Sequence, residues 1–269
     1  MREPEFHSSW VTASGTERGS GNLTGRFPFW SFTKTVIAVC TLKLCEDGVL
    51  DLDGRLDGVS YTLRQLLAHT SGLADYGSIR SLRPERGGLT PTWDTCSHVN
   101  RSRWLWGLGF AHLVDDIICR PLGLASIELA TTQDQFSRLY WKAAEHYHPG
   151  WVYHGCLTGT VVDAARVLHG LFSGRLLCAA MLDEMLARRP LGGKIPGRPW
   201  TDCGYGLGLM NGRMGGSGRA IGHSGGGPFS VNAIYHFPDR DDPVTVACFT
   251  DGKDEGQAEF FAAGLAHVA

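Results

Sequence analysis

The chain has 269 residues, of which 43% are hydrophobic and 19% charged, and its formal net charge at pH 7 is −2. This apolar content excludes an intrinsically disordered chain, and the length suffices for one large domain or two joined ones. The charge balance excludes a protein that binds nucleic acid through a basic surface, because no excess of cations is available to neutralise phosphates. The 36 glycines are about twice the usual share of roughly 7% and indicate many tight turns or close backbone approaches.

Targeting signals are not visible in the sequence. No apolar run approaches the roughly 18 residues that a membrane helix needs. The opening MREPEFHSSW lacks the basic and then apolar segments of a signal peptide. The eight cysteines are scattered without a C-x-x-C pair, which is typical of free thiols in a reducing compartment. We therefore expect a cytoplasmic protein that does not associate with membranes.

The first part of the chain predicts one buried helix. Residues 1–26 are polar and rich in Gly, Ser and Thr, which indicates a loose or weakly stranded lead-in. Residues 33–47 are apolar on nearly every side of a helix that Gly48 ends. A helix that is apolar on all sides is buried, and because burying a charge is costly, the few charged residues of this helix require an explanation.

The middle of the chain predicts short helices separated by an irregular stretch. YTLRQLLAH, at 61–69, has the pattern of a short helix, and residues 74–100 contain several Pro and Gly breakers. Residues 101–124 then predict one or two helices that Pro121 stops.

The last part predicts a change from helices to strands. Helices are expected at 160–172 and 176–188. Apolar residues occupy the odd positions of 229–237, which predicts a strand with one buried face, and 244–249 returns as its antiparallel partner. Residues 253–269 close the chain as an amphipathic helix. This order predicts an α+β fold in which an antiparallel sheet is flanked by helices.

Ser31 and Lys34 stand at the start of the buried helix. Residues three apart share a helix face, so their side chains can touch, whereas Lys43 faces the opposite way. A lysine at the start of an apolar helix is desolvated, which favours the neutral amine and lets it act as a base toward a neighbouring hydroxyl. The N–H groups of the helix N-terminus point at the same place. The tetrapeptide alone also fits an N-capping serine beside a surface lysine, and its context decides between the two.

That context is PFWSFTKT followed by the buried helix and YTLRQLLAHTSGLADYG. Together these segments resemble the serine β-lactamase and penicillin-binding-protein superfamily, in its class C-like branch of esterases, D-aminopeptidases and related hydrolases. The resemblance runs over 28–76, resumes at 120–124 and continues through GWVYHGCLTGTVVDAARVLHGL and IGHSGGGPFS to the end. It implies a sheet domain formed by 1–75 and 150–269, with an inserted and shortened helical subdomain at 76–149.

The resemblance also implies roles for individual residues. Ser31 would be the acyl-accepting nucleophile and Lys34 its general base. The third motif of the family is Lys/His-x-Gly on a strand that lines the site, and His223, Ser224 and Gly225 match it. The resemblance implies that His223 is catalytic and that Ser224 and Gly225 bind substrate. The oxyanion hole would combine the backbone N–H of Ser31 with that of Gly226. The alternative for the histidine of this motif is a solvated turn residue in a Gly-rich hairpin.

The second motif of the family, Tyr-x-Asn or Ser-x-Asn, has no clear match. It supplies a hydroxyl that relays protons between nucleophile, lysine and leaving group. The nearest string, WDTCSH, puts Cys96 in the place of the tyrosine, then Ser97, and His98 in the place of the asparagine. A thiol is a poorer donor than a phenol, so this match predicts an impaired relay; the alternative is that Cys96 is a small buried residue in a shortened loop. His69 resembles the family's structural turn histidine, bonded to backbone, and is given no catalytic role.

The leading hypothesis is a serine hydrolase that forms an acyl-enzyme with small esters, amides, D-amino-acid peptides or β-lactams. Its partner would be a small-molecule acyl substrate, with no nucleic acid and no membrane. No metal or organic cofactor is expected, because neither H-E-x-x-H nor a cysteine pair accompanies Glu145, His146 and His148. The absence of G-x-S-x-G argues against an α/β-hydrolase. The alternative is a catalytically weakened relative that binds acyl or peptidoglycan-like ligands without efficient turnover.

Overall fold

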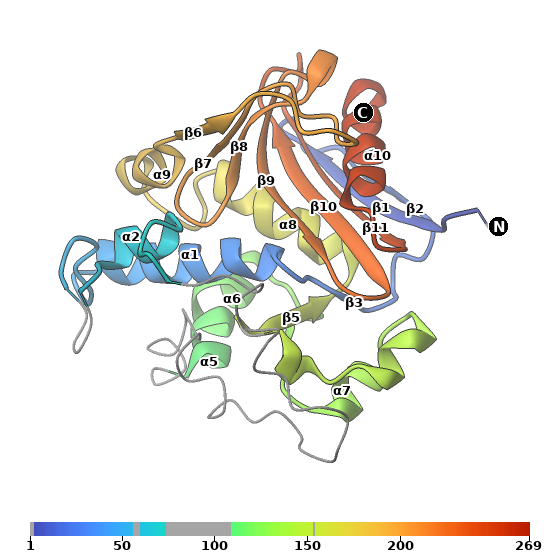
Figure 1. Cartoon of the computed structure of the whole chain (residues 1–269), viewed down its shortest axis with the longest axis horizontal. Helices are drawn as coiled ribbons and strands as arrows, with labels where there is room; N and C mark the ends of the chain where they lie inside the picture. The colour runs from blue at the N-terminus through green and yellow to red at the C-terminus, as the bar shows by residue number, and fades with distance from the viewer. Residues whose placement is uncertain (1–2, 56–59, 74–108, 153) are drawn as a thin grey trace.

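The structure of the protein is a computed structural model that describes residues 3–55, 60–73, 109–152 and 154–269. Its main feature is an eight-stranded antiparallel sheet to which both ends of the chain contribute. In sheet order the strands are β2 (Glu17–Ser20), β1 (Phe6–Thr12), β11 (Val244–Asp251), β10 (Ser230–Phe237), β9 (Arg219–Gly226), β8 (Met210–Arg213), β7 (Cys203–Tyr205) and β6 (Arg189–Gly192). Figure 1 shows β9 and β10 crossing the centre of the molecule.

Helices flank this sheet on both faces (Figure 1). The longest described helices are α1 (Phe32–Glu46), α8 (Val161–Phe172) and α10 (Glu255–Val268). The shorter helical segments are α2 (Leu63–Leu67), α5 (Phe110–Val114), the π-helical turn η2 (Asp115–Cys119), α6 (Arg120–Leu122), α7 (Gln133–Ser137), η3 (Lys142–His146), η4 (Pro149–Trp151), α9 (Ala179–Leu186) and η5 (Gly215–Ser217). A second sheet has the order β3 (Phe27–Pro28), β5 (Cys156–Gly159) and β4 (Glu128–Ala130). The expected α+β fold is confirmed.

Of the two alternatives for the lead-in before residue 27, loose or weakly stranded, the structure shows strands. The lead-in forms β1 and β2, and β1 pairs with β11 along its whole length, from Phe6 opposite Thr250 to Thr12 opposite Val244. The side chains of this segment indicate a strand only weakly, because its buried residues include His7 and two serines. The hydrogen bonds of the ladder with β11 therefore decide the structure here.

The strand β10 is buried on both faces, although one exposed face was predicted. Its odd positions, such as Tyr235, pack in the core beneath α10, as the period of the sequence indicates. Its even positions lie on the face that α8 packs against and are covered as well. Three of these even residues are polar and each has a hydrogen-bond partner: Ser230 accepts from Trp30, Asn232 donates to the Pro28 carbonyl, and His236 bonds Thr245.

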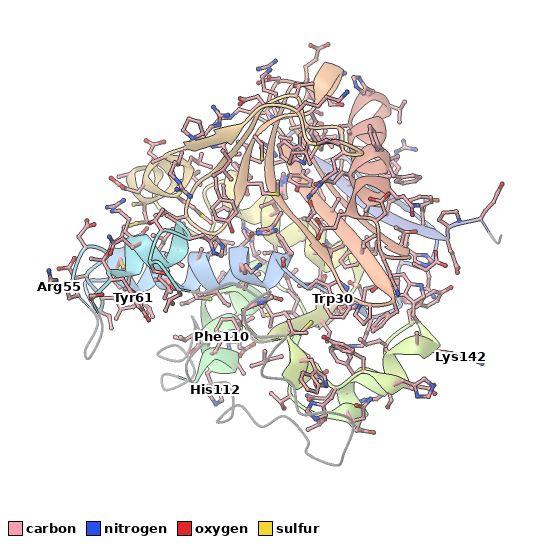
Figure 2. The ribbon with its side chains drawn as sticks, in the orientation of Figure 1. Trp30, Arg55, Tyr61, Phe110, His112 and Lys142 are labelled. Carbon is pink, nitrogen blue, oxygen red and sulfur yellow. The ribbon has the colours of Figure 1, made fainter. Side chains whose placement is uncertain are left out.

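The helix before residue 124 ends at a glycine and not at Pro121. The helical segment runs from α5 through the π-helical turn into α6, whose first turn contains Pro121. Cys119 and Arg120 keep helical dihedral angles directly before the proline, so Pro121 does not end the segment. The chain leaves the helix at Gly123, which has φ +68°. On α5, buried Phe110 packs in the core with α1 residues, whereas His112 is exposed (Figure 2).

Residues 74–108, which include the first part of the predicted helical subdomain, lie outside the described residues. Within the part that the structure describes, no helix has both the length and the apolar character that crossing a membrane requires.

Buried His236 makes stability depend on pH. Its Nδ1 is 3.0 Å from the Thr245 hydroxyl and its ring stacks on Phe172. Burial lowers the pKa of His236 from 6.5 to about 4. The unfolded chain therefore binds a proton near pH 6.5 that the folded chain binds only near pH 4, so the stabilisation is complete above pH 6.5 and is lost as the pH falls between these values.

The unfolding free energy should fall between pH 7.5 and pH 4.5, and we expect this fall to be smaller in His236→Gln than in the unsubstituted protein by about 2 to 3 kcal/mol. Urea unfolding at the two pH values measures this difference. Exposed His112→Gln is the control and should leave it unchanged. Equal pH dependence in both variants would show that His236 titrates normally in the folded protein.

Candidate active site

Ser31 and Lys34 meet at the start of α1. The Nζ of Lys34 donates a hydrogen bond to the Oγ of Ser31 across 2.9 Å. Ser31 occupies the N-cap position of α1, but its side chain makes no capping hydrogen bond. The hydroxyl is therefore engaged with the lysine and not with the helix end. Thr35, one residue beyond Lys34, is buried and donates to the Gly208 carbonyl across 2.8 Å, which anchors this turn of the helix.

The turn before Ser31 is strained and held from two sides. Trp30 has φ +43°, a conformation that bulky residues avoid. Its indole N–H donates to the Ser230 hydroxyl at 3.0 Å, and its carbonyl lies 3.2 Å from Nε2 of His154. The ring also contacts Phe229 edge-on. These contacts fix the carbonyl and ring of Trp30 and so set the direction of the Ser31 side chain.

Strand β9 lies directly against this turn because its last residues are glycines. A Cβ atom on Gly225 would lie 2.6 Å from the Ser31 backbone nitrogen, and one on Gly227 would lie 2.2 Å from the Trp30 ring. Both distances are shorter than non-bonded atoms allow. Gly225 therefore lets the strand approach the turn at Trp30 and Ser31, and it brings Gly226 to the edge of the same cavity as Ser31.

We expect Gly225→Ala to lower activity by at least about 100-fold, because the strand must move away from Ser31, and to destabilise the fold by about 1–3 kcal/mol. Initial rates with an activated ester and thermal unfolding measure the two effects. Gly264→Ala on α10 is the matched control, because its Cβ meets nothing within 4 Å. It should keep the activity and stabilise the helix slightly. An active Gly225→Ala enzyme would contradict the close approach.

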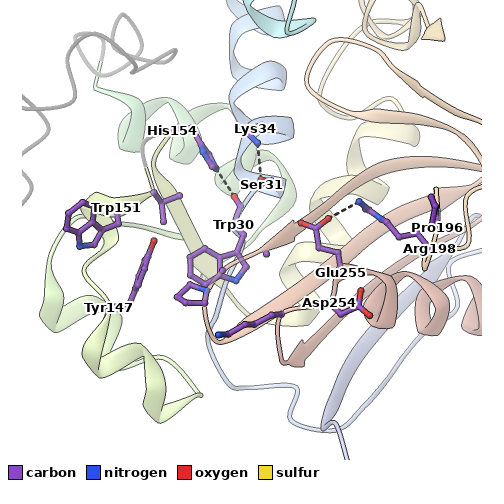
Figure 3. A pocket seen from close by; sticks show the side chains of 15 residues that line it. Trp30, Ser31, Lys34, Tyr147, Trp151, His154, Pro196, Arg198, Asp254 and Glu255 are labelled. Carbon is purple, nitrogen blue, oxygen red and sulfur yellow. Dashed lines mark hydrogen bonds and ion pairs between the residues drawn. The ribbon is translucent and has the colours of Figure 1, made fainter. Parts of the chain in front are cut away.

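The cavity beside Ser31 has a volume of about 850 Å³ and is shown in Figure 3. Ser31, Lys34 and Gly226 lie on its wall. Three aromatic residues and four charged residues also line it: Trp30, Tyr147, Trp151, Arg198, Lys253, Asp254 and Glu255. The volume suits a small organic molecule, and the aromatic wall suits an apolar group on it.

His223 lies on β9, as predicted, but its side chain contacts neighbours other than Ser31. Its Nε2 is 3.1 Å from the Tyr205 hydroxyl, which is also 3.0 Å from Nε2 of His69. Burial, and secondarily the nearby Lys34, lower the pKa of His223 well below its ordinary value. His223 is thus held neutral in a hydrogen-bond chain behind the serine–lysine pair, and the solvated turn residue is not what the structure shows.

The side chain of Ser224, a predicted substrate-binding residue, is buried and contacts the other side of β9. Its hydroxyl accepts from Arg198 at 3.0 Å and bonds Tyr235 and Glu259. Any contact of Ser224 with a substrate would therefore use its backbone. The predicted second-motif residues Cys96, Ser97 and His98 lie outside the described residues.

His154 is a residue of the site that the sequence analysis missed. It is buried, lines the cavity with Lys34, and bonds the Trp30 carbonyl (Figure 3). Burial, and secondarily Lys34, lower the pKa of His154 well below its ordinary value. The segment GWVYHGCLTGT carried part of the family resemblance, but nothing in its pattern indicates that this histidine reaches a residue 124 positions earlier.

The fold and the site define a serine hydrolase type in which a serine–lysine pair begins a buried helix beside an antiparallel sheet. The sequence matches the β-lactamase family model over residues 11–88 and 99–269, and the chain belongs to the β-lactamase family.

Solved structures with the same fold are distant in sequence. D-amino acid amidase from Ochrobactrum anthropi SV3 superposes with a TM-score of 0.76 at 19% identity, covering 98% of this chain and 94% of that one. A D-stereospecific amidohydrolase from Streptomyces sp. gives 0.68 at 19% identity over 97% and 92% of the two chains. A β-lactamase from Mycobacterium bovis gives 0.68 at 21% identity over 98% and 93%. No curated protein matched the sequence.

Proposed function

We propose that the chain hydrolyses small acyl compounds through an acyl-enzyme on Ser31, with Lys34 as the general base and His223 as a neutral supporting group. The observation that carries the proposal is the 2.9 Å hydrogen bond between Lys34 Nζ and Ser31 Oγ at the wall of the cavity. A serine hydroxyl is a weak nucleophile until an adjacent base takes its proton, and a neutral lysine amine is such a base.

Acylation proceeds in two steps. The Ser31 oxygen forms a bond to the substrate carbonyl carbon while its proton passes to the neutral Lys34 amine, and the carbonyl π electrons move to oxygen. The C–O or C–N bond to the leaving group then breaks as the carbonyl re-forms, and the leaving group takes the proton from the Lys34 ammonium. A water molecule then attacks the ester carbonyl in the same way, which releases the acid and restores Ser31 and neutral Lys34.

The negative charge of the tetrahedral oxygen would be stabilised by the backbone N–H groups of Ser31 and Gly226. Both residues line the cavity, and the close approach at Gly225 places their strand and turn side by side. Removal of one oxyanion-hole donor typically costs about 10²–10³ in rate.

Small esters, amides, D-amino-acid peptides and β-lactams are the proposed substrates. The aromatic wall of Trp30, Tyr147 and Trp151 supports an apolar group on the bound molecule. The fold of D-amino acid amidase, solved with phenylalanine and with phenylalanine amide, is consistent with this class.

Intact-protein mass spectrometry tests the proposal. Incubation with a fluorophosphonate or a penicillin should add one acyl or phosphonyl group per chain, and an activated ester should give a burst followed by steady turnover. A stable adduct without turnover would favour the alternative, a weakened relative that binds acyl ligands. No adduct with any of the three reagents would contradict the proposed function.

The unmatched second motif makes a separate prediction about leaving groups. We expect p-nitrophenyl esters to be cleaved better than the matching amides by about 10²–10⁴ beyond their intrinsic difference in reactivity, because p-nitrophenolate needs no proton to leave. Cys96→Tyr should narrow this gap by accelerating amide cleavage. Cys178 is exposed, and Cys178→Tyr is the control, which should leave the difference between ester and amide cleavage unchanged. An unchanged ester-to-amide ratio in Cys96→Tyr would mean that Cys96 does not occupy the place of the relay.

A further inference from the structure

The cavity holds a carboxylate, Glu255, on the side opposite the aromatic wall. Glu255 is the first residue of α10, and Figure 3 shows it between Ser31 and Arg198. One of its oxygens, Oε2, is 3.0 Å from a terminal nitrogen of Arg198. A Cβ atom on Gly226 would lie 3.2 Å from the other oxygen, Oε1, so this oxygen lies beside the proposed oxyanion donor.

Arg198 is shared between Glu255 and a second carboxylate. Its Nε donates to Glu259 at 2.6 Å, and another of its nitrogens also pairs with that residue. The Glu259 side chain is completely buried and also accepts from Trp200 at 3.0 Å. One guanidinium thus faces two carboxylates, and of these two only Glu255, one-third exposed, reaches the cavity, whose wall also carries Lys34 and Lys253.

A carboxylate beside Gly226 has a cost for the proposed reaction. It repels the negative oxygen that develops during acylation unless a cation lies between the two charges. An ammonium group on the carbon next to the scissile carbonyl meets this need, because its nitrogen is about 2.5 Å from the carbonyl carbon. A substrate carbonyl bound at Gly226 would therefore bring such an ammonium close to Glu255.

We propose that Glu255 is the specificity residue that holds the ammonium of an α-amino acyl substrate, so that the preferred substrates are esters or amides of amino acids with a free amine. This inference rests on the proposed function and names its substrate class. Asp254, the neighbouring acid, does not share this role, since its Oδ1 accepts the Gly256 N–H at 2.9 Å as the N-cap of α10.

The test compares p-nitrophenyl esters with and without the amine. The amino ester is that of phenylalanine, used in both enantiomers, and the ester without the amine is that of 3-phenylpropionic acid. The rates are compared at about pH 6, because the ester lowers the amine pKa below the roughly 7.7–8.0 of a peptide α-amino group and the amine must be protonated. We expect kcat/KM to favour the amino ester, in at least one enantiomer, by about 10- to 100-fold, the usual value of a hydrogen bond to a charged group. Glu255→Gln should reduce this preference to less than about threefold, mainly by slowing the amino ester.

Asp254→Asn is the matched control, because it removes the adjacent charge while asparagine still caps the helix, and it should keep the preference. Thermal unfolding of each variant verifies that it is folded. Equal rates on the two esters in the unsubstituted protein, or an undiminished preference in Glu255→Gln, would overturn the assignment while leaving the acyl-enzyme intact. If neither ester is hydrolysed, the proposed function itself fails and the assignment fails with it.

Discussion

Replacing Ser31 by alanine is expected to abolish acylation and to lower turnover of activated esters by about 10⁴-fold or more, as removal of a nucleophile does elsewhere. The Oγ that bonds Lys34 would be gone, so the lysine would have no nucleophile to activate at this turn. Burst amplitude with a p-nitrophenyl ester measures the effect directly.

The same substitution should leave the fold intact. The Ser31 side chain makes no capping bond, so its loss costs less than the roughly 1 kcal/mol of an ordinary N-cap. Ser71→Ala, in the turn that follows α2, is the control and should retain the burst. A normal burst in Ser31→Ala would place the nucleophile elsewhere.

Replacing Lys34 by arginine should abolish acylation almost as completely. A guanidinium keeps its proton at any working pH, so it cannot accept the proton of Ser31. The positive charge at the start of α1 is kept, which separates base chemistry from simple electrostatics. Single-turnover acylation rates measure the loss.

Lys43→Arg provides the comparison on the same helix. Lys43 pairs with Glu46 at 2.7 Å and Asp47 at 2.8 Å near the other end of α1, away from the cavity. Arginine can keep these ion pairs, so acylation should be unchanged. Retained acylation in Lys34→Arg would mean that another base is at work, and buried His154 would then be the first candidate to examine.

The serine–lysine pair is predictable from sequence because its geometry is local. Residues three apart on one helix face must lie near each other, and the apolar pattern of 33–47 already requires that this helix be buried. The glycines after His223 were likewise expected beside the site. The physical reason proved to be the approach of β9 to Ser31 and Trp30, and not only room for a substrate.

The rest of the site depends on contacts between distant segments. His154 bonds a residue 124 positions away, and Arg198 meets Glu259 across 61 positions. No periodic pattern encodes such contacts, because they follow from the order of strands in the sheet and from where α10 packs on it. The second buried face of β10 could not be predicted for the same reason: the helix that covers it, α8, lies much earlier in the chain.

Peptide mapping of the acylated protein is the most direct test of the central claim, that Ser31 carries the acyl group. After brief incubation with a fluorophosphonate or a penicillin, the chain is digested and the modified peptide is sequenced by mass spectrometry. We expect the adduct on Ser31, in the segment PFWSFTKT. An adduct on Ser71 or Ser224, or labelling that persists unchanged in Ser31→Ala, would contradict the account.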